Sequence, residues 1–216
     1  METIQELISY VGTNAGYIWV EFYRHFLMAA YGVLFASIIA IPLGILIARY
    51  GKLSGWVLSI GSMIQTIPAL GAMAIIMLFL GLGVNTAVFT LALYSILPIT
   101  QNTYVGMKSV DKNVIEAGIA CGMTRFQVLR MVELPLAISV IMAGLRNAIV
   151  IGIGIAAVGA FIGAGGLGAI IITGTNATDG TAIILAGAIP TALMAIIADM
   201  VMGWIERKVH PIKSSS

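Results

Sequence analysis

Hydrophobic residues occur along this chain in long runs that are separated by short polar segments. A helix needs about 20 mostly apolar residues to cross the hydrocarbon core of a bilayer. Runs of this kind predict membrane spans at about residues 26–48, 56–82, 86–104, 136–159 and 181–204. The expected fold is an all-α, polytopic membrane protein with five transmembrane helices.

The ends of the chain have a different pattern. In residues 1–22, Ile4, Leu7 and Val11 share one helical face, which is typical of a helix that lies on the membrane surface. Disorder is the alternative for this extracytoplasmic segment. Residues 207–216 follow the last apolar run and are expected to form a polar cytoplasmic tail.

Polar residues interrupt two of the apolar runs. Gln65 and Thr66 precede Pro68, whose missing N–H and ring should break the helix at membrane depth. Such irregular backbone is tolerated in a membrane where it is buried in protein or faces a water-filled cavity, so the break is either a packing kink or part of a translocation path. The full set of candidates for that path is Gln65, Thr66, Pro68, Tyr94, Asn102, Arg146 and Asn147.

The longest polar segment, between the third and fourth runs, predicts two short helices joined by an elbow. Asp111 is placed to cap the first helix, and Gly122 to end it in the left-handed conformation that glycine adopts without strain. Thr124 and Gln127 have the spacing of a capping box, which begins the second helix. Pro135 cannot extend that helix and suits the first turn of the next one.

Composition supports a membrane protein and excludes other classes. Hydrophobic residues make up 60% of the 216 positions, charged residues 9%, and the mean hydropathy is +1.05. The net charge of +2 does not favour a nucleic-acid partner. If the elbow is cytoplasmic, nine of the eleven Lys and Arg residues lie inside, because only Arg24 is outside and Arg146 lies within a span. The amino terminus is then outside and the carboxyl terminus in the cytoplasm.

The sequence contains no motif for chemistry of its own. No Gly-x-x-x-x-Gly-Lys occurs, so ATP hydrolysis is not expected of this chain. The glycine-rich connection at 159–180 follows a membrane span and is therefore interpreted as a turn, whose apolar residues 169–172 are too few to cross and either re-enter the membrane or cap a pore. His25 and His210 lack the spacing of metal ligands.

Two sets of residues resemble a known family. The first set comprises Glu116-Ala117-Gly118, Gly122 and Glu133-Leu134-Pro135, which is similar to the EAA loop in the membrane subunits of bacterial ABC importers. The second comprises Gln65-Thr66-Ile67-Pro68-Ala69-Leu70, Asn102-Thr103-Tyr104 and the segment 161–168. It is similar to the permeases of importers for glycine betaine, carnitine and choline. Gly118 replaces the second Ala of the EAA pattern, which could loosen the first helix by up to ~1 kcal/mol.

The resemblance implies a five-helix permease core of the MetI-like type, embedded in the bacterial cell membrane, with a cytoplasmic coupling loop at 105–135. It implies partners: a cytoplasmic ATPase dimer, a second permease that is a copy or a paralogue, and an extracytoplasmic substrate-binding protein. ATP and Mg belong to the ATPase, and no cofactor is expected here. The implied ATPase contacts are Asp111, Glu116, Ala117, Gly118, Gly122, Met123, Thr124, Arg125, Leu134 and Pro135.

Two charged residues have more than one interpretation. Glu116 is either an ordinary solvated carboxylate or a contact with the ATPase. Arg146 lies within a span and should find a partner in the protein interior, for which Asp199 is the natural candidate. The alternatives for Arg146 are a place in the pore lining or a role in substrate binding.

The function expected from these observations is ATP-driven import of compatible solutes. An importer for amino acids, methionine or another small solute shares the elbow and is the first alternative. A passive channel would give flux without ATP, and a membrane anchor would bind a partner without accumulating solute.

Overall fold

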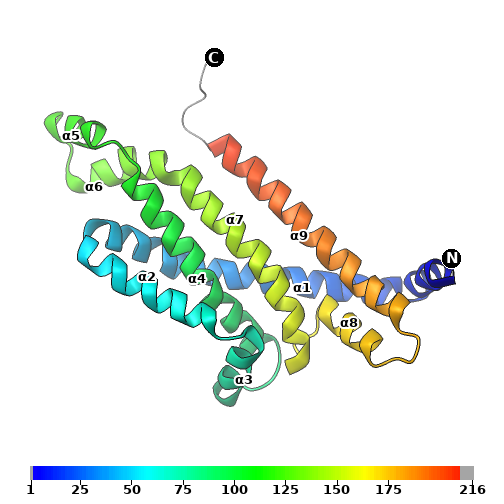
Figure 1. Cartoon of the computed structure of the whole chain (residues 1–216). Helices are drawn as coiled ribbons and strands as arrows, with labels where there is room; N and C mark the ends of the chain where they lie inside the picture. Colours follow the sequence, from blue (N-terminus) through cyan, green and yellow to red (C-terminus); the bar gives the residue numbers. More distant parts are fainter. Residues whose placement is uncertain (1, 210–216) are drawn as a thin grey trace.

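The computed structural model describes residues 2–209, which form helices joined by short turns and contain no β-strand in that range (Figure 1). The helices are α1 (Glu2–Arg49), α2 (Gly51–Thr66), α3 (Ala69–Leu80), α4 (Val84–Lys108), α5 (Lys112–Ala120), α6 (Arg125–Val128), the π-helical η1 (Leu129–Glu133), α7 (Leu134–Val158), the 3₁₀ turn η2 (Gly159–Ile162), α8 (Leu167–Thr175) and α9 (Thr181–Val209). Of the expected tail, residues 210–216 lie outside the described residues.

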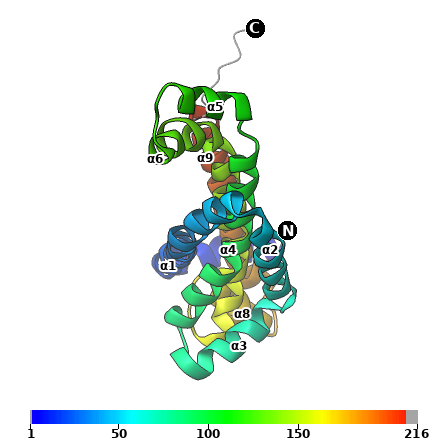
Figure 2. The same cartoon turned by 90° about the vertical axis from the view of Figure 1, so that its left-hand side faces the viewer.

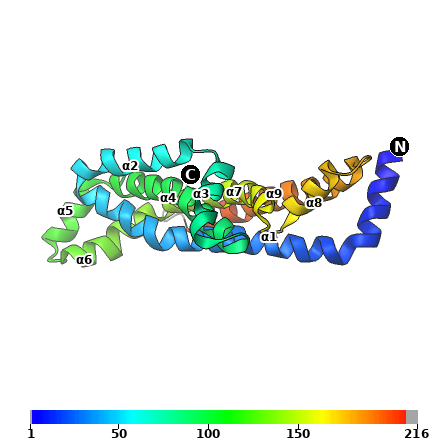
Figure 3. The same ribbon diagram turned by 90° about the horizontal axis from the view of Figure 1, so that it is seen from below.

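The first helix is longer than the apolar run within it. α1 continues from Glu2 to Arg49, and its only non-helical backbone angles are at Asn14 (φ −110°, ψ 17°). Figure 3 shows the N-terminal part of α1 bent away from the rest of the helix. The Asn14 amide donates to the Tyr10 carbonyl at 3.0 Å and so competes with the helix backbone. Residues 2–22 are therefore helical, with a break in the helix at Asn14.

The core is formed where α1, α4 and α7 pack against one another, with α9 beside α7 (Figure 1). Small residues permit this close approach. A Cβ on Gly144 would lie 2.6 Å from the Asn102 Cβ, and one on Gly32 would lie 2.6 Å from the Leu91 Cβ. The backbones of these helices are thus nearer than larger side chains would allow, as is usual in membrane helix bundles.

Within residues 2–209, four helical segments are long and apolar enough to cross a membrane, and α2 with α3 makes a fifth only if the pair counts as one span. The two helices meet at 96°, across the predicted break before Pro68. The second apolar run is therefore not a straight crossing. Pro68 ends the helical hydrogen bonding of α2, as expected. The direction of α3 follows from its packing on α4 and η2.

Pro135 lies in the first turn of α7, as expected, but no gap separates the elbow from the fourth span. Helical structure continues from Arg125 through Pro135 to Ile162. The junction is η1, in which the Leu134 N–H donates to the Leu129 carbonyl, five residues earlier. This π-helical turn gives the proline ring room and leaves no helical donor unused, because Pro135 has no N–H.

The elements lie in order along an elongated body. The elbow formed by α5 and α6 lies at one end of it, and α3 and α8 lie toward the other (Figures 1 and 2). The end of α9 lies on the elbow side. The predicted ATPase contacts of the elbow therefore lie at one end of the body, and the path candidates lie on the helices of the body itself.

Candidate coupling site and translocation path

The elbow has the local structure that its residues predict. The Asp111 carboxylate accepts from the Asn113 N–H at 2.9 Å and caps α5. Gly122 has φ +82°, the left-handed conformation that reverses the chain after Cys121. No atom lies within 4 Å of where a Gly122 Cβ would be, so backbone conformation alone demands glycine here.

The second arm of the elbow begins at a complete capping box. The Gln127 N–H donates to Thr124 Oγ1 at 3.3 Å, and the Thr124 N–H donates to Gln127 Oε1 at 2.7 Å. Both bonds satisfy backbone donors that a helix start leaves unpaired. The two arms are therefore held at a defined angle by local interactions.

Most of the predicted ATPase contacts are exposed together on this elbow. Glu116 and Ala117 lie on the exposed side of α5, while Gly118 faces inward toward Met123. Large apolar side chains are exposed beside them: Ile119 (55%), Phe126 (68%) and Met131 (65%). A pocket of ≈ 360 Å³ opens between Phe126, Gln127, Arg130 and Met131. Exposed apolar groups at the polar end of the molecule indicate a protein-binding surface.

Leu134 and Pro135 do not belong to that surface in the same way. Leu134 packs beside the buried cluster of Met107, Val110, Ala137 and Ile141, which lies between α4 and α7. Pro135 is exposed on the first turn of α7. Both residues lie at the start of α7 and belong to neither α5 nor α6.

The structure adds an ion pair at the base of the elbow that sequence reasoning missed. Glu133 is buried, and its Oε2 accepts from Nη2 of Arg49, the last residue of α1. The available signals were Glu133, shortly before the predicted span 136–159, and Arg49, directly after the predicted span 26–48. The pairing could not be recognised because the two residues are 84 positions apart.

Two of the path candidates brace the helix break. The Gln65 side-chain amide donates to the Tyr94 carbonyl at 3.0 Å, and the Tyr94 hydroxyl donates to the Ile67 carbonyl, which the break leaves without a helical partner. These contacts correspond to the packing interpretation of the break. Thr66 and Pro68 are exposed, and the Thr66 hydroxyl donates to the Met63 carbonyl at 2.7 Å.

The remaining path candidates lie on α4 and α7. Asn102 is half-buried, and its side-chain amide donates to the Pro98 carbonyl at 2.8 Å. Pro98 has no N–H to donate to the Tyr94 carbonyl four residues earlier, and the Gln65 amide donates to that carbonyl instead. Asn147 is exposed on α7. The structure thus leaves Thr66, Pro68 and Asn147 available to a pore or to a second subunit.

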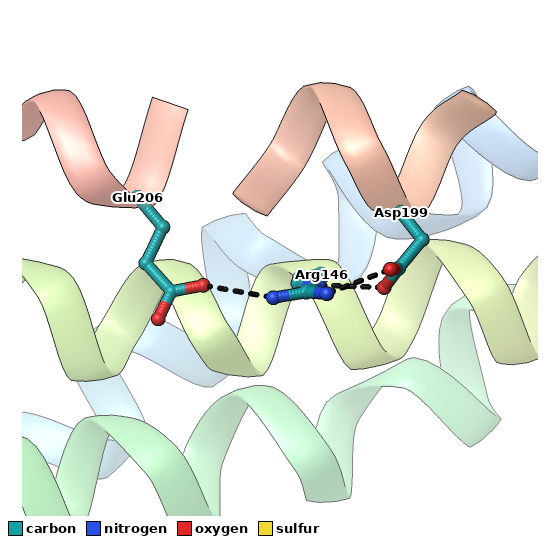
Figure 4. Close-up of polar contacts among 3 residues, drawn as sticks. All are labelled: Arg146, Asp199 and Glu206. Atoms are coloured by element: carbon teal, nitrogen blue, oxygen red, sulfur yellow. Dashed lines mark hydrogen bonds and ion pairs between the residues drawn. The ribbon is translucent and has the colours of Figure 1, made fainter. Parts of the chain in front are cut away.

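Arg146 lies between two carboxylates of α9 (Figure 4). Its Nε and Nη2 donate to the two carboxylate oxygens of Asp199, each at 2.6 Å, and Nη1 lies 3.5 Å from Glu206 Oε2. Gly203 makes room, because a Cβ there would lie 3.0 Å from Nη1. Of the three interpretations of Arg146, the geometry corresponds to a structural ion pair that joins α7 to α9.

Reversing either charge of that pair should lower the amount of folded protein in the membrane several-fold, because an unpaired charge in a span is costly. The variants are Arg146→Asp and Asp199→Arg, and the measurement is the quantity of monodisperse protein recovered in detergent. The double reversal should recover part of the loss. Equal yields for the single and double variants would contradict the pairing.

A second polar cluster lies toward the opposite end of α1. The Glu21 carboxylate is buried and accepts from the Gly166 N–H and from Arg24, the latter at 2.9 Å. His25 is fully buried beside it, and its Nε2 lies 2.9 Å from the Ile153 carbonyl. Gly166 has φ +78°, and a Cβ there would lie 3.1 Å from His25 Nδ1. The glycine-rich connection is thus a turn packed on the polar side chains of Glu21 and His25.

No group of His, Cys, Asp or Glu able to hold a metal ion occurs among residues 2–209. Cys121 is exposed at the bend of the elbow.

Comparison with protein families gives one decisive match. The family described as binding-protein-dependent transport system inner membrane component matches residues 40–211. This chain belongs to that family. The permease is accordingly a multi-pass membrane protein of the ABC importer class, in agreement with its apolar helices.

The permease is similar in sequence to several solute-transport permeases. It is 66% identical to the glycine betaine/carnitine/choline transport system permease protein OpuCD of Bacillus subtilis (strain 168), over 99% of this chain and 93% of the relative. It is 62% identical to the carnitine transport permease protein OpuCD of Listeria monocytogenes serotype 1/2a (strain 10403S), over 99% and 96%. With the choline transport system permease protein OpuBD of Bacillus subtilis (strain 168), identity is 59% over 99% and 94%.

The fold of the permease also matches solved structures. An inward-facing structure of the MetNI methionine ABC transporter superposes with a TM-score of 0.80, covering 89% of this chain and 95% of that one at 20% identity. The expected MetI-like, all-helical core is therefore confirmed.

Proposed function

We propose that this chain is the permease subunit of an ATP-driven importer for compatible solutes of the glycine betaine, carnitine and choline type. The observation that carries the proposal is the 66% identity with the Bacillus subtilis permease over nearly the full length of both chains. The importers of methionine and amino acids share the fold at about 20% identity, which carries no argument about the solute.

In this proposal the elbow binds a cytoplasmic ATPase dimer, which holds ATP and Mg. The support is the placement of Glu116, Phe126 and Met131 on an exposed surface at the polar end of the chain. The amino terminus is outside and the elbow and carboxyl terminus are cytoplasmic, on the count of Lys and Arg residues. An extracytoplasmic binding protein would select the solute and deliver it to the permease.

A second permease chain completes the path, because the path candidates Thr66, Pro68 and Asn147 are exposed in a single copy. We favour a paralogue over a second copy of this chain. The relatives OpuCD and OpuCB of Bacillus subtilis carry the same transport-system name, and this chain is 66% identical to the first and 39% identical to the second. Two non-identical permeases are thus named for one system.

The test is uptake by the complex purified from native membranes with its associated subunits and reconstituted into liposomes. Radiolabelled glycine betaine should accumulate only with ATP, and carnitine and choline should compete. Competition by methionine alone would support the amino-acid alternative. ATP-independent flux would support a channel, and partner binding without accumulation would support an anchor. Recovery of a second, different permease chain would distinguish the paralogue from a homodimer.

A further inference from the structure

Glu133 lies where the elbow joins the membrane-spanning part of the chain. It is the last residue of η1, which connects the exposed elbow to the membrane-spanning α7. Its carboxylate is only 4% exposed, although the nearby Arg130 and Met131 are exposed. Its one ion-pair partner among residues 2–209 is Arg49, at the end of α1. Two helices that are distant in sequence are thus joined by charge next to the elbow.

This pair should resist separation. A carboxylate removed from water is strongly destabilised without a charged or hydrogen-bonding partner. The surrounding contacts are apolar: Ile45 and Ala48 of α1 pack against the same cluster as Leu129 and Leu134. Apolar packing permits sliding more easily than a directed charge pair does, so the ion pair fixes the end of α1 to η1.

The π-helical turn makes η1 a suitable point of movement. One extra residue is inserted into the helix, and the following Pro135 supplies no N–H to the turn before it. Such turns interrupt the regular i→i+4 pattern and commonly mark functional discontinuities in helices. Displacement of the elbow therefore reaches Glu133 before it reaches the body of α7.

The opposite part of α1 is also tied to another segment. Glu21 accepts from the Gly166 N–H in the glycine-rich connection before α8. The 28 residue steps from Glu21 to Arg49 extend about 42 Å as a helix. From Glu21 to Arg49, α1 is thus one continuous helix that contains Pro42, and a buried carboxylate contact holds each end of this stretch.

Resting on the proposed function, we infer that Arg49 and Glu133 are positioning residues that transmit displacement of the elbow to α1. Through α1, the displacement reaches the glycine-rich connection toward the other end of the body. When the pair is lost, the ATPase still binds the elbow and hydrolyses ATP, but α1 no longer follows. Uptake then becomes uncoupled from hydrolysis.

The experiment measures glycine betaine accumulated per ATP hydrolysed by the complete complex in liposomes. Glu133→Gln and Arg49→Gln should each lower this ratio about tenfold, with hydrolysis kept within about twofold of the original. The double variant Arg49→Glu/Glu133→Arg should restore most of the ratio. Lys52→Gln is the matched control, because Lys52 is an exposed cation three residues from Arg49. It should leave the ratio unchanged.

An unchanged ratio in both single variants would overturn the inference. So would a proportional fall in uptake and hydrolysis with less assembled complex, which is the signature of a purely structural pair, or a double variant that recovers nothing. Failure of the proposed function has a different signature. In that case the unaltered complex itself shows no ATP-dependent accumulation of glycine betaine.

Discussion

Gly168→Ala should destabilise the packing of α8 on α7 by ~3 kcal/mol, because overpacking against backbone forces the two helices apart. An added Cβ would lie 2.1 Å from the Ala157 carbonyl oxygen and 2.8 Å from its carbon. Backbone atoms of a helix cannot move aside as the end of a flexible side chain can. The first turn of α8, with its buried Leu167 and Ile170, would therefore have to leave its place.

Thermal unfolding of the purified protein in detergent is the measurement, and a drop in the midpoint by several degrees is expected. Gly154→Ala is the matched control, since Gly154 is exposed on α7 and has no atom within 4 Å of the added Cβ. That substitution should be neutral or stabilise α7 by up to ~1 kcal/mol through helix propensity. A Gly168→Ala protein as stable as Gly154→Ala would contradict the close packing described for α8.

Local structure of the elbow could be predicted because its determinants are close in sequence. Asp111, Gly122 and the Thr124–Gln127 capping box act over two to four residues, and each is found in the expected role. The Arg146–Asp199 contact joins residues 53 positions apart and could still be predicted from the sequence. A charge at membrane depth needs a partner, and very few acidic residues lie within the apolar runs.

Features that depend on tertiary packing could not be predicted. Pro68 indicates that a helix ends, but the 96° turn into α3 depends on which neighbours α3 contacts. Pro135 was expected to separate two helices, and the π-helical turn that avoids this has no sequence signature of its own. Glu21 reaches Gly166 across 145 residues, between a segment expected to lie on the membrane surface and a connection interpreted as a turn. Pairs of this kind become visible only when the helices have been assembled.

Glu116→Arg should lower uptake of glycine betaine by the complete complex about thirtyfold, the size of effect expected at a central contact of a protein interface. Glu116 is exposed on α5, next to the apolar side chains that make the elbow a binding surface. Reversing its charge would place a cation against whatever donor or cation the ATPase presents to it. The ATPase should consequently copurify in smaller amount, while the permease itself remains folded.

The control is Glu6→Arg, the same substitution at an exposed position in the first turns of α1, which is expected to leave uptake unchanged. Glu116→Gln separates charge from size, because it keeps the side-chain volume and removes only the negative charge. A graded loss from Glu116→Gln to Glu116→Arg would identify an electrostatic contact. If Glu116→Arg retains full uptake and the ATPase still copurifies, Glu116 is an ordinary solvated carboxylate, and the contact must be sought at Phe126 and Met131, whose apolar surfaces do not depend on charge.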